Sequence, residues 1–314
     1  MKKNKRTRTL PAAAVLAIDF LLFLAALPLF ALFHHVIAYP MNGDYGTVPM
    51  TKEAPDWSEK FAAHFAPEGT VETGDTFYRD SSLSIEVTRG EKDGAVYHLA
   101  DVYISDPTRL KTAFAGGAFS RGVADSVVNM ARENGAVFAV SGDYCGIRER
   151  GIVIRNGVVY RKTKAHQIGA LFYDGVFKTY PFSVFRVESA IESGAWQVWD
   201  FGPELLQDGR AITEFSTGIS GPNPRMAFGY FEPGHYCFIA VDGRQAQSKG
   251  LTLVQLAALF EEIGCRTAYN LDGGHSAVMI LNGKIVNSPS APGGRDISDI
   301  IYFPAQAEQE QGAL

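Results

Sequence analysis

Polar, glycine-containing turns follow three apolar stretches of the sequence, each placed like the end of a strand. They are Ser141-Gly142-Asp143-Tyr144, Val241-Asp242-Gly243-Arg244 and Leu271-Asp272-Gly273-Gly274-His275-Ser276. Glycine lets a backbone turn sharply or approach a ligand closely. Carboxylate, imidazole and hydroxyl side chains accept protons or donate to anions. Because a sheet brings several strand ends together and loops on a rigid scaffold carry function, we expect the three turns to form one site.

A cation joins this set at the start of a fourth apolar stretch. Arg225 lies within the segment GPNPRMAFG, directly before the apolar residues. Taken singly, an Asp-Gly pair after a strand is most often an ordinary turn. The specificity therefore comes from the combination of acids, glycines, a histidine and a cation at neighbouring strand ends.

Strands and hairpins dominate the pattern around these turns. Alternating apolar and polar residues in LSIEVTR and AVYHLADVYIS predict paired strands. Turn residues separate further apolar pairs at Asn156-Gly157, Asp174-Gly175, Glu232-Pro233-Gly234 and Asn282-Gly283. Helical signals occur near residues 56–61, 123–133, 183–192 and 252–263. We expect an α+β fold with a largely antiparallel, partly mixed sheet and a few packed helices.

Charge is distributed unevenly along the 314 residues. The first ten residues hold five of the 29 basic residues, so the remainder carries 24 basic against 34 acidic residues, a formal charge of −10. Nucleic-acid binding requires clustered positive charge, and we therefore exclude a nucleic acid as the partner of this acidic body.

An apolar stretch follows the basic decapeptide, from about Leu10 to Ile37, and is interrupted only by Asp19 and Pro28. A helix of about 20 to 25 such residues spans a bilayer. The stretch lacks a convincing small-residue cleavage site, which favours an uncleaved transmembrane signal anchor over a signal peptide. Positive charge on the short N-terminal side predicts a cell-membrane protein whose body lies outside the cytoplasm.

The three cysteines, Cys145, Cys237 and Cys265, are odd in number and irregularly spaced, which does not indicate a disulfide framework. We expect each to be a small buried side chain, although one pair could form a bridge outside the cell. No histidine and cysteine spacing resembles a zinc site. No motif specifies a cofactor, and a structural calcium held by carboxylates and carbonyls stays open.

Ordered motifs give the sequence a clear family resemblance. NPRMAFG, VDGRQAQSKGLTL, AYNLDGGHSAVMILNG, VNSPS and RDISDIIYF, with SGDY and FGPELLQDG upstream, closely resemble the phosphodiester glycosidase family from about Leu83 to Phe303. That family includes a lysosomal enzyme that removes N-acetylglucosamine from mannose-6-phosphate diesters. It also includes bacterial proteins labelled as exopolysaccharide-biosynthesis proteins, which this sequence resembles more.

The resemblance implies a domain order and a function. We expect a basic end and anchor (1–40), a linker with a short helix (41–80), a phosphodiester glycosidase-like domain (81–304) and a disordered tail (305–314). The implied activity is hydrolysis of a sugar-1-phosphodiester in a glycan or cell-envelope polymer. Alternatives are a glycan-binding or exopolysaccharide-assembly protein on the same fold, and a phosphodiesterase that breaks the P–O bond.

Residue roles are implied in the same way. Phosphate is a leaving group that needs little protonation, so one carboxylate suffices as nucleophile or base, which relaxes the two-carboxylate scheme of ordinary glycosidases. Asp272 is the first choice, with Asp143 and Asp242 as alternatives. The predicted phosphate ligands are Arg225 and Arg244, with Arg295 as a third candidate, and the backbone of Gly273 and Gly274, with Ser276 beside them.

Two positions depart from the family pattern. His275 stands where the family usually has a third glycine, and it serves either in proton transfer or phosphate binding, or as an ordinary loop residue. Ser141 stands where the family usually has asparagine. Serine lacks the paired donor and acceptor of an amide, which weakens the prediction of sugar contacts at Ser141.

The predicted orientation is testable by a fusion. A reporter that functions only outside the cytoplasm should be active when it is fused after Leu314, because the positive-inside rule places the body of the protein outside. The matched measurement uses a reporter that functions only in the cytoplasm, and its activity in the same fusion would reject the orientation.

Overall fold

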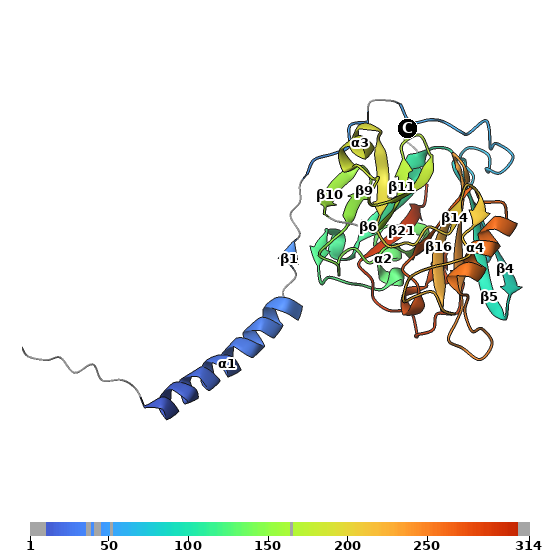
Figure 1. Cartoon of the computed structure of the whole chain (residues 1–314). Coiled ribbons are helices and arrows are strands. Elements are labelled where there is room, and N and C mark those ends of the chain that lie inside the picture. The colour runs from blue at the N-terminus through green and yellow to red at the C-terminus, as the bar shows by residue number, and fades with distance from the viewer. Residues whose placement is uncertain (1–10, 36–38, 41–44, 51–52, 164–165, 307–314) are drawn as a thin grey trace, which may run out of the picture. The chain divides into compact units, whose positions relative to one another are not determined.

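The computed structural model describes residues 11–35, 39–40, 45–50, 53–163 and 166–306. The chain divides into two compact units, Met1–Tyr39 and Pro40–Leu314 (Figure 1), and each is considered by itself. The basic decapeptide and the tail from residue 307 lie outside the described residues.

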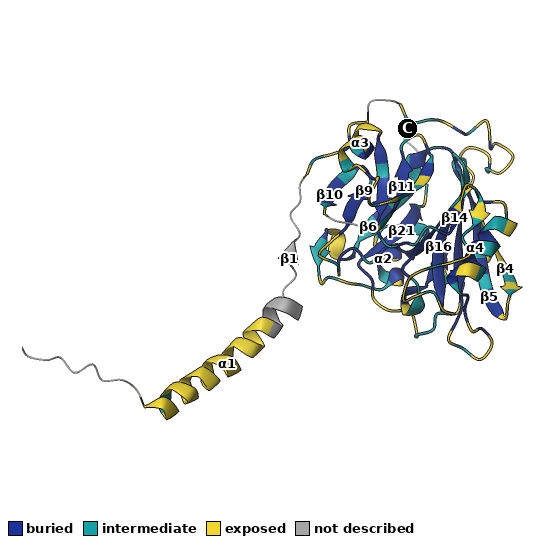
Figure 2. Ribbon diagram, viewed as in Figure 1, coloured by how far each residue is buried: buried dark blue, intermediate teal, exposed yellow. Residues whose placement is uncertain are grey.

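The first unit contains one long helix, α1 (Ala12–His35), which includes Asp19 and Pro28. Its 24 residues correspond to a length of about 36 Å. The segment Ala12–Phe30 is long and apolar enough to cross a membrane, and none of that segment is buried within the structure (Figure 2). A membrane anchor and a signal peptide both satisfy this test of length and composition.

The second unit is built on three main sheets. The largest has the strand order β18 (Thr267–Leu271), β16 (Arg225–Glu232), β17 (His235–Val241), β5 (Ala95–Ile104), β4 (Leu83–Lys92), β3 (Phe77–Arg79) and β2 (Glu72–Thr73). The second has the order β20 (Lys284–Ile285), β19 (Met279–Leu281), β8 (Ala136–Ser141), β21 (Asp299–Pro304) and β6 (Lys111–Phe114). The third has the order β10 (Val158–Lys162), β9 (Ile152–Arg155), β13 (Ala195–Trp199), β11 (Gln167–Phe172) and β12 (Phe177–Pro181).

Short elements complete the chain. They are the strands β1 (Tyr39–Pro40), β7 (Ser120–Arg121), β14 (Leu206–Gln207) and β15 (Arg210–Ala211), the helices α2 (Val127–Glu133), α3 (Val187–Glu192) and α4 (Leu253–Glu262), and the 3-10 turns η1 (Pro107–Arg109), η2 (Ala115–Gly117) and η3 (Gly274–Ser276). In the three main sheets, the strand pairs that the structure describes are all antiparallel. The expected α+β class is confirmed.

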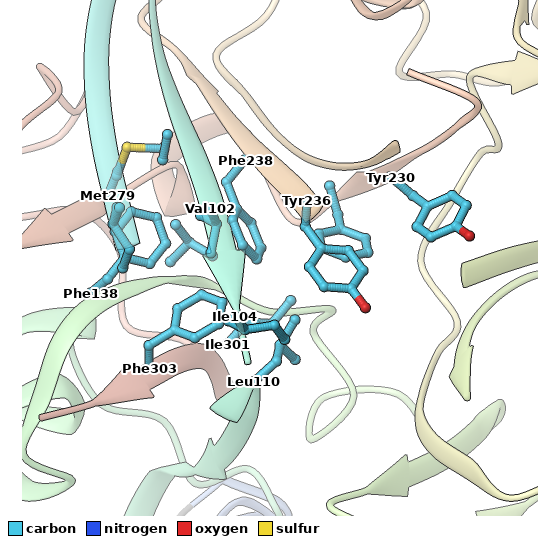
Figure 3. Packing of buried hydrophobic residues seen from close by; sticks show 14 of the residues in the cluster. Val102, Ile104, Leu110, Phe138, Tyr230, Tyr236, Phe238, Met279, Ile301 and Phe303 are labelled. Atoms are coloured by element: carbon cyan, nitrogen blue, oxygen red, sulfur yellow. The ribbon is translucent and has the colours of Figure 1, made fainter. Parts of the chain in front are cut away.

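The main hydrophobic core lies where the sheets face one another (Figure 3). Phe138 of β8 packs with its ring centroid 5.5 Å from Phe238 of β17, which joins the second sheet to the first. Phe177 of β12 packs edge-on at 4.8 Å against Phe228 of β16, which joins the third sheet to the first. Helices cover the outer faces: α4 packs on the first sheet, α2 on the second and α3 on the third.

Local sequence signals match most elements. Asn156 and Gly157 have φ of 51° and 72°, as the predicted β9–β10 hairpin requires. Helix α2 begins four residues later than position 123, because the Ser126 hydroxyl accepts from the Asn129 N–H at 3.1 Å and caps it there. Residues 58–64 form turns instead of the expected short helix. Phe61 within that region and Trp57 directly before it are buried in the core.

A fully buried ion triad connects the second and third sheets. Arg155, at the end of β9, places Nη2 2.9 Å from Asp143 Oδ1 and 3.1 Å from Asp299 Oδ2. The Asp143 N–H donates to Asp299 Oδ1 at 3.1 Å. The Asp200 N–H donates to the other Asp143 oxygen at 2.9 Å. Burial alone would raise the pKa of Asp143, but Arg155 and this N–H bring it below its usual range.

Replacing the central cation should destabilise the protein. Arg155→Met leaves two buried carboxylates without their cation, so we expect a loss of about 3–5 kcal/mol in the free energy of unfolding, measured by urea titration. Arg210→Met is the control, because the Arg210 side chain is 85% exposed in its ion pair with Glu261, and such pairs contribute at most about 1 kcal/mol. Equal effects of the two substitutions would contradict this role of Arg155.

Candidate active site

The first sheet brings three of the predicted site segments side by side. Strand β16 lies between β17 and β18: its Arg225 pairs with Val241 at the end of β17, and its Met226 pairs with Leu271 at the end of β18. Consequently Arg225, the Asp242–Arg244 turn and the Asp272–Ser276 turn meet at one edge of the sheet. The expectation that these strand ends converge is therefore met in the structure.

The turn after β8 joins the same edge through hydrogen bonds. The Ser141 hydroxyl donates to the Asp272 carbonyl at 2.8 Å. The Asp272 N–H donates to the Gly142 carbonyl at 3.0 Å. Gly142 cannot carry a side chain here, because a Cβ would lie 2.5 Å from the Asp299 carboxyl carbon.

Close backbone packing explains the paired glycines of the Asp272 turn. A Cβ on Gly273 would lie 2.7 Å from the Pro224 carbonyl oxygen, so only glycine fits without a shift. Gly274 has a φ of 63°, and its N–H donates to the same carbonyl at 2.8 Å. The turn is thereby fixed against the start of β16.

A cavity of about 200 Å³ lies at this edge, and we name it the arginine cavity. Its lining contains seven of the predicted site residues: Arg225, Arg244, Asp272, Gly273, Gly274, His275 and Arg295. The other lining residues are Phe201, Ile219, Asn223, Pro224, Asn270 and Leu271. Asp272 and Arg225 thus face one cavity.

Asp272 is held by an arginine and a serine. Arg295 Nη2 lies 3.2 Å from Asp272 Oδ2. The same nitrogen donates to the Ser276 hydroxyl at 2.8 Å, and Arg295 Nε donates to it at 3.0 Å. Burial raises the pKa of the Asp272 carboxyl above its ordinary value, although Ser276 and Arg295 both act to lower it. A carboxylate fixed in direction and raised in pKa is suited to act as a base or a nucleophile.

Arg225 is buried without a carboxylate partner among the described residues. Its guanidinium donates instead to the main-chain carbonyls of Leu251 at 3.0 Å, Ile219 at 2.7 Å and Gly221 at 2.5 Å. Burial lowers its pKa to about 10, and the positive charge of Arg244 contributes to the shift. Carbonyl dipoles hold this side chain in place but leave its formal charge uncancelled.

Arg244 supplies a second cation beside the Asp272 turn. Its Nη2 donates to the Asn223 side-chain oxygen at 2.9 Å, and the guanidinium lies against Gly274. It has no carboxylate partner in the part of the chain that the structure describes. Arg225 and Arg244 together make this end of the arginine cavity suitable for an anion.

The remaining predicted site residues support the turns from outside the lining. Asp143 lies in the buried ion triad. Asp242 Oδ1 accepts from the Ser288 N–H at 2.8 Å and from Asn287 Nδ2 at 3.3 Å. Ser141 and Ser276 are fully buried and bind the Asp272 turn and Arg295. These contacts leave Asp272 as the one acid of the three candidates that lines the arginine cavity.

His275 is exposed at the rim. Its Nδ1 lies 3.1 Å from the Ser290 hydroxyl, and its main-chain carbonyl accepts from the Arg295 N–H at 2.8 Å. The backbone of His275 therefore helps to place Arg295, which in turn contacts Asp272. These contacts leave open the two predicted roles of the imidazole.

One group of metal-ligand side chains occurs among the described residues: Asp143, Cys145 and Asp299, whose ligand atoms lie within 4.8 Å of one another. Arg155 already supplies positive charge to both carboxylates. Burial and the nearby carboxylates raise the pKa of the Cys145 thiol, which disfavours the thiolate that a metal requires. This group does not fit a metal, and the structural calcium stays a prediction.

Asn270 is a lining residue that the sequence prediction did not include. Its Nδ2 donates to the Gly202 carbonyl at 2.8 Å, whereas its Oδ1 has no hydrogen-bond partner among the described residues. Asn270 precedes Asp272 by two positions at the end of β18, and both line the arginine cavity. A polar residue within the otherwise apolar stretch AYNL was the available signal.

Comparison with known proteins gives the family. The sequence model of the phosphodiester glycosidase family matches residues 134–303, which include every predicted site residue. A prophage-derived uncharacterized protein of Bacillus subtilis, YomE, is 31% identical over 187 residues, covering 56% of this chain and 29% of that protein. The mouse N-acetylglucosamine-1-phosphodiester alpha-N-acetylglucosaminidase is 34% identical over 76 residues, covering 24% of this chain and 14% of the enzyme. The chain thus spans less than a third of the length of these relatives.

Solved structures agree on the fold. The catalytic domain of the zebrafish N-acetylglucosamine-1-phosphodiester alpha-N-acetylglucosaminidase, auto-inhibited by its pro-peptide, superposes with a TM-score of 0.56 at 20% identity, covering 85% of this chain and all of that one. A hypothetical protein from Synechocystis gives a TM-score of 0.55 at 14% identity, covering 76% of this chain and 64% of that one. The family match extends over more than half of the sequence and contains the arginine cavity's acid and cations. The chain belongs to the phosphodiester glycosidase family.

Proposed function

We propose that this protein is a membrane-anchored, extracytoplasmic hydrolase that cleaves the bond between a sugar and a phosphodiester in a glycan or cell-envelope polymer. The observation that carries the proposal is the convergence of Asp272 with Arg225 and Arg244 on one cavity. Helix α1 supports the anchor by its length and composition. The resemblance to bacterial exopolysaccharide-biosynthesis proteins supports a glycan substrate.

The cations account for phosphate binding. Arg225 and Arg244 lack carboxylate partners within the described chain, so their charge is available to the non-bridging phosphate oxygens. The same charge stabilises the phosphomonoester that departs when the glycosidic bond breaks. Because this leaving group is a weak base, the reaction needs no strong acid opposite Asp272.

Asp272 accounts for the attack. Its carboxylate acts either as a base, taking a proton from water that adds to the anomeric carbon, or as a nucleophile on that carbon with hydrolysis afterwards. Arg295 and Ser276 keep the carboxylate oriented in both schemes. The overall balance is water plus diester giving free sugar plus phosphomonoester.

Product analysis tests this proposal. The full-length protein in detergent is incubated with the methyl phosphodiester of α-N-acetylglucosamine-1-phosphate in ¹⁸O-labelled water. Free sugar carrying the label and methyl phosphate without it are the expected products. Label in phosphate would favour the P–O phosphodiesterase, and the absence of cleavage across a panel of glycosyl methyl phosphates would favour the non-catalytic glycan-binding alternative.

Asp272→Asn should reduce the rate at least ~10²-fold while preserving the fold, because the amide cannot act as base or nucleophile. Because burial raises the pKa of Asp272, the wild-type rate should begin to fall at a higher pH, as the solution is acidified, than it would if the catalytic group were an exposed aspartate. Asp75→Asn is the control, because Asp75 forms an exposed ion pair with Lys284. Near-normal turnover by folded Asp272→Asn would move the role to Asp143 or Asp242.

A further inference from the structure

A second, larger cavity adjoins the arginine cavity. Its volume is about 910 Å³, and it shares Phe201 and Ile219 with the arginine cavity. Sites for small organic ligands usually have about 300–1,000 Å³. At about 200 Å³ the arginine cavity is below this range, so a phosphodiester bound there must extend beyond it. The shared residues make the larger cavity the adjacent space.

The two cavities differ in charge. The arginine cavity has Arg225, Arg244 and Arg295 against the single acid Asp272. The larger cavity has two arginines against four acids: Arg148 and Arg150, and Glu149, Asp200, Glu204 and Glu214. Glu149 is already paired with Arg121, which lies outside this lining. Burial raises the pKa of Asp200 to about 7, so that Glu204 and Glu214 remain against the two arginines. The first cavity therefore favours an anion, whereas the second has no excess of positive charge to attract one.

The contacts within the larger cavity match hydroxyl groups and apolar sugar faces. Phe201 presents a ring, with the Arg148 guanidinium 5.0 Å from its centroid on one side. Gln167, Ser216 and Thr217 add amide and hydroxyl groups to the lining. Glu214 is exposed and has no ion-pair partner among the described residues, so its carboxylate is free to accept from hydroxyls.

We propose that the larger cavity binds an uncharged carbohydrate part of the substrate, which rests on the proposed function of the arginine cavity. The substrate is then a diester with one phosphate beside a neutral glycan. A polymer with a phosphate on every repeat fits less well, because its second phosphate would enter a cavity that has no excess of positive charge.

Binding measurements test the proposal separately from turnover. Three glycosyl phosphodiesters are compared: the methyl diester, a diester that carries a neutral disaccharide, and the same disaccharide diester with a further phosphate on its terminal sugar. The comparison is made in two sets, with the disaccharide on the alcohol side of the phosphate in one set and on the glycosyl side in the other. Dissociation constants are measured by calorimetry with full-length Asp272→Asn protein, so that cleavage does not interfere.

We expect at least one neutral disaccharide diester to bind ~10-fold more tightly than the methyl diester, and its phosphorylated form to lose most of that gain. Equal affinity of methyl and neutral disaccharide diesters in both sets would overturn the proposal. So would equal affinity of the neutral and phosphorylated forms. Wild-type protein that binds in the expected order but releases no product would refute the proposed hydrolysis and leave the binding assignment standing.

Two substitutions locate the effect. Ile212→Trp narrows the larger cavity, since Ile212 is in its lining and absent from that of the arginine cavity. It should abolish the disaccharide gain and leave methyl diester affinity unchanged, whereas Val254→Trp, at an exposed position of α4, should change neither. Glu214→Lys should raise affinity for the phosphorylated form at least about threefold. An unchanged order of affinities in folded Ile212→Trp protein would contradict the assignment.

Discussion

A buried guanidinium between two carboxylates has a favourable environment only while all three groups remain in place, and the edge of the first sheet depends on such a set. Arg155 pairs with Asp143 and Asp299, and the Asp299 carbonyl accepts from the Gly142 N–H at 2.9 Å. Gly142 in turn accepts from the Asp272 N–H. A continuous series of polar contacts thus leads from Arg155 of the third sheet to the main chain of Asp272, the proposed catalytic residue.

That arrangement separates structural charge from available charge. In the triad Arg155 faces two carboxylates away from water, so its positive charge orders the loops and is not available to a ligand. Around the arginine cavity, Arg225 is held by carbonyls and Arg244 by an amide oxygen, and both keep their net charge. The presence or absence of a carboxylate partner distinguishes the two classes of arginine more clearly than burial does, because Arg155 and Arg225 are both buried.

Local signals made much of this fold predictable. The hairpin at Asn156-Gly157 follows from residues that tolerate positive φ, and α4 from Thr252 as N-cap and from its apolar face. The placement of Arg225 and Asp272 in one cavity followed from the common strand edge. Sequence reasoning ranked Asp272 first but kept Asp143 as an alternative, because the cation that pairs with Asp143 is Arg155 on another sheet. The role of Asn270 and the larger cavity also depend on loops that meet only in the folded chain.

The hydrogen bonds of Arg225 to Ile219 and Gly221 have a thermodynamic consequence. Ile219 lines both cavities. The Arg225 side chain, which lines the arginine cavity, therefore also holds part of the wall of the larger cavity in place. Any ligand that draws the Arg225 guanidinium toward itself weakens these hydrogen bonds and alters the shape of the larger cavity. Linkage then requires the effect to be reciprocal. If a ligand in one cavity changes the affinity of the other cavity by some factor, a ligand in the other cavity changes the affinity of the first by the same factor.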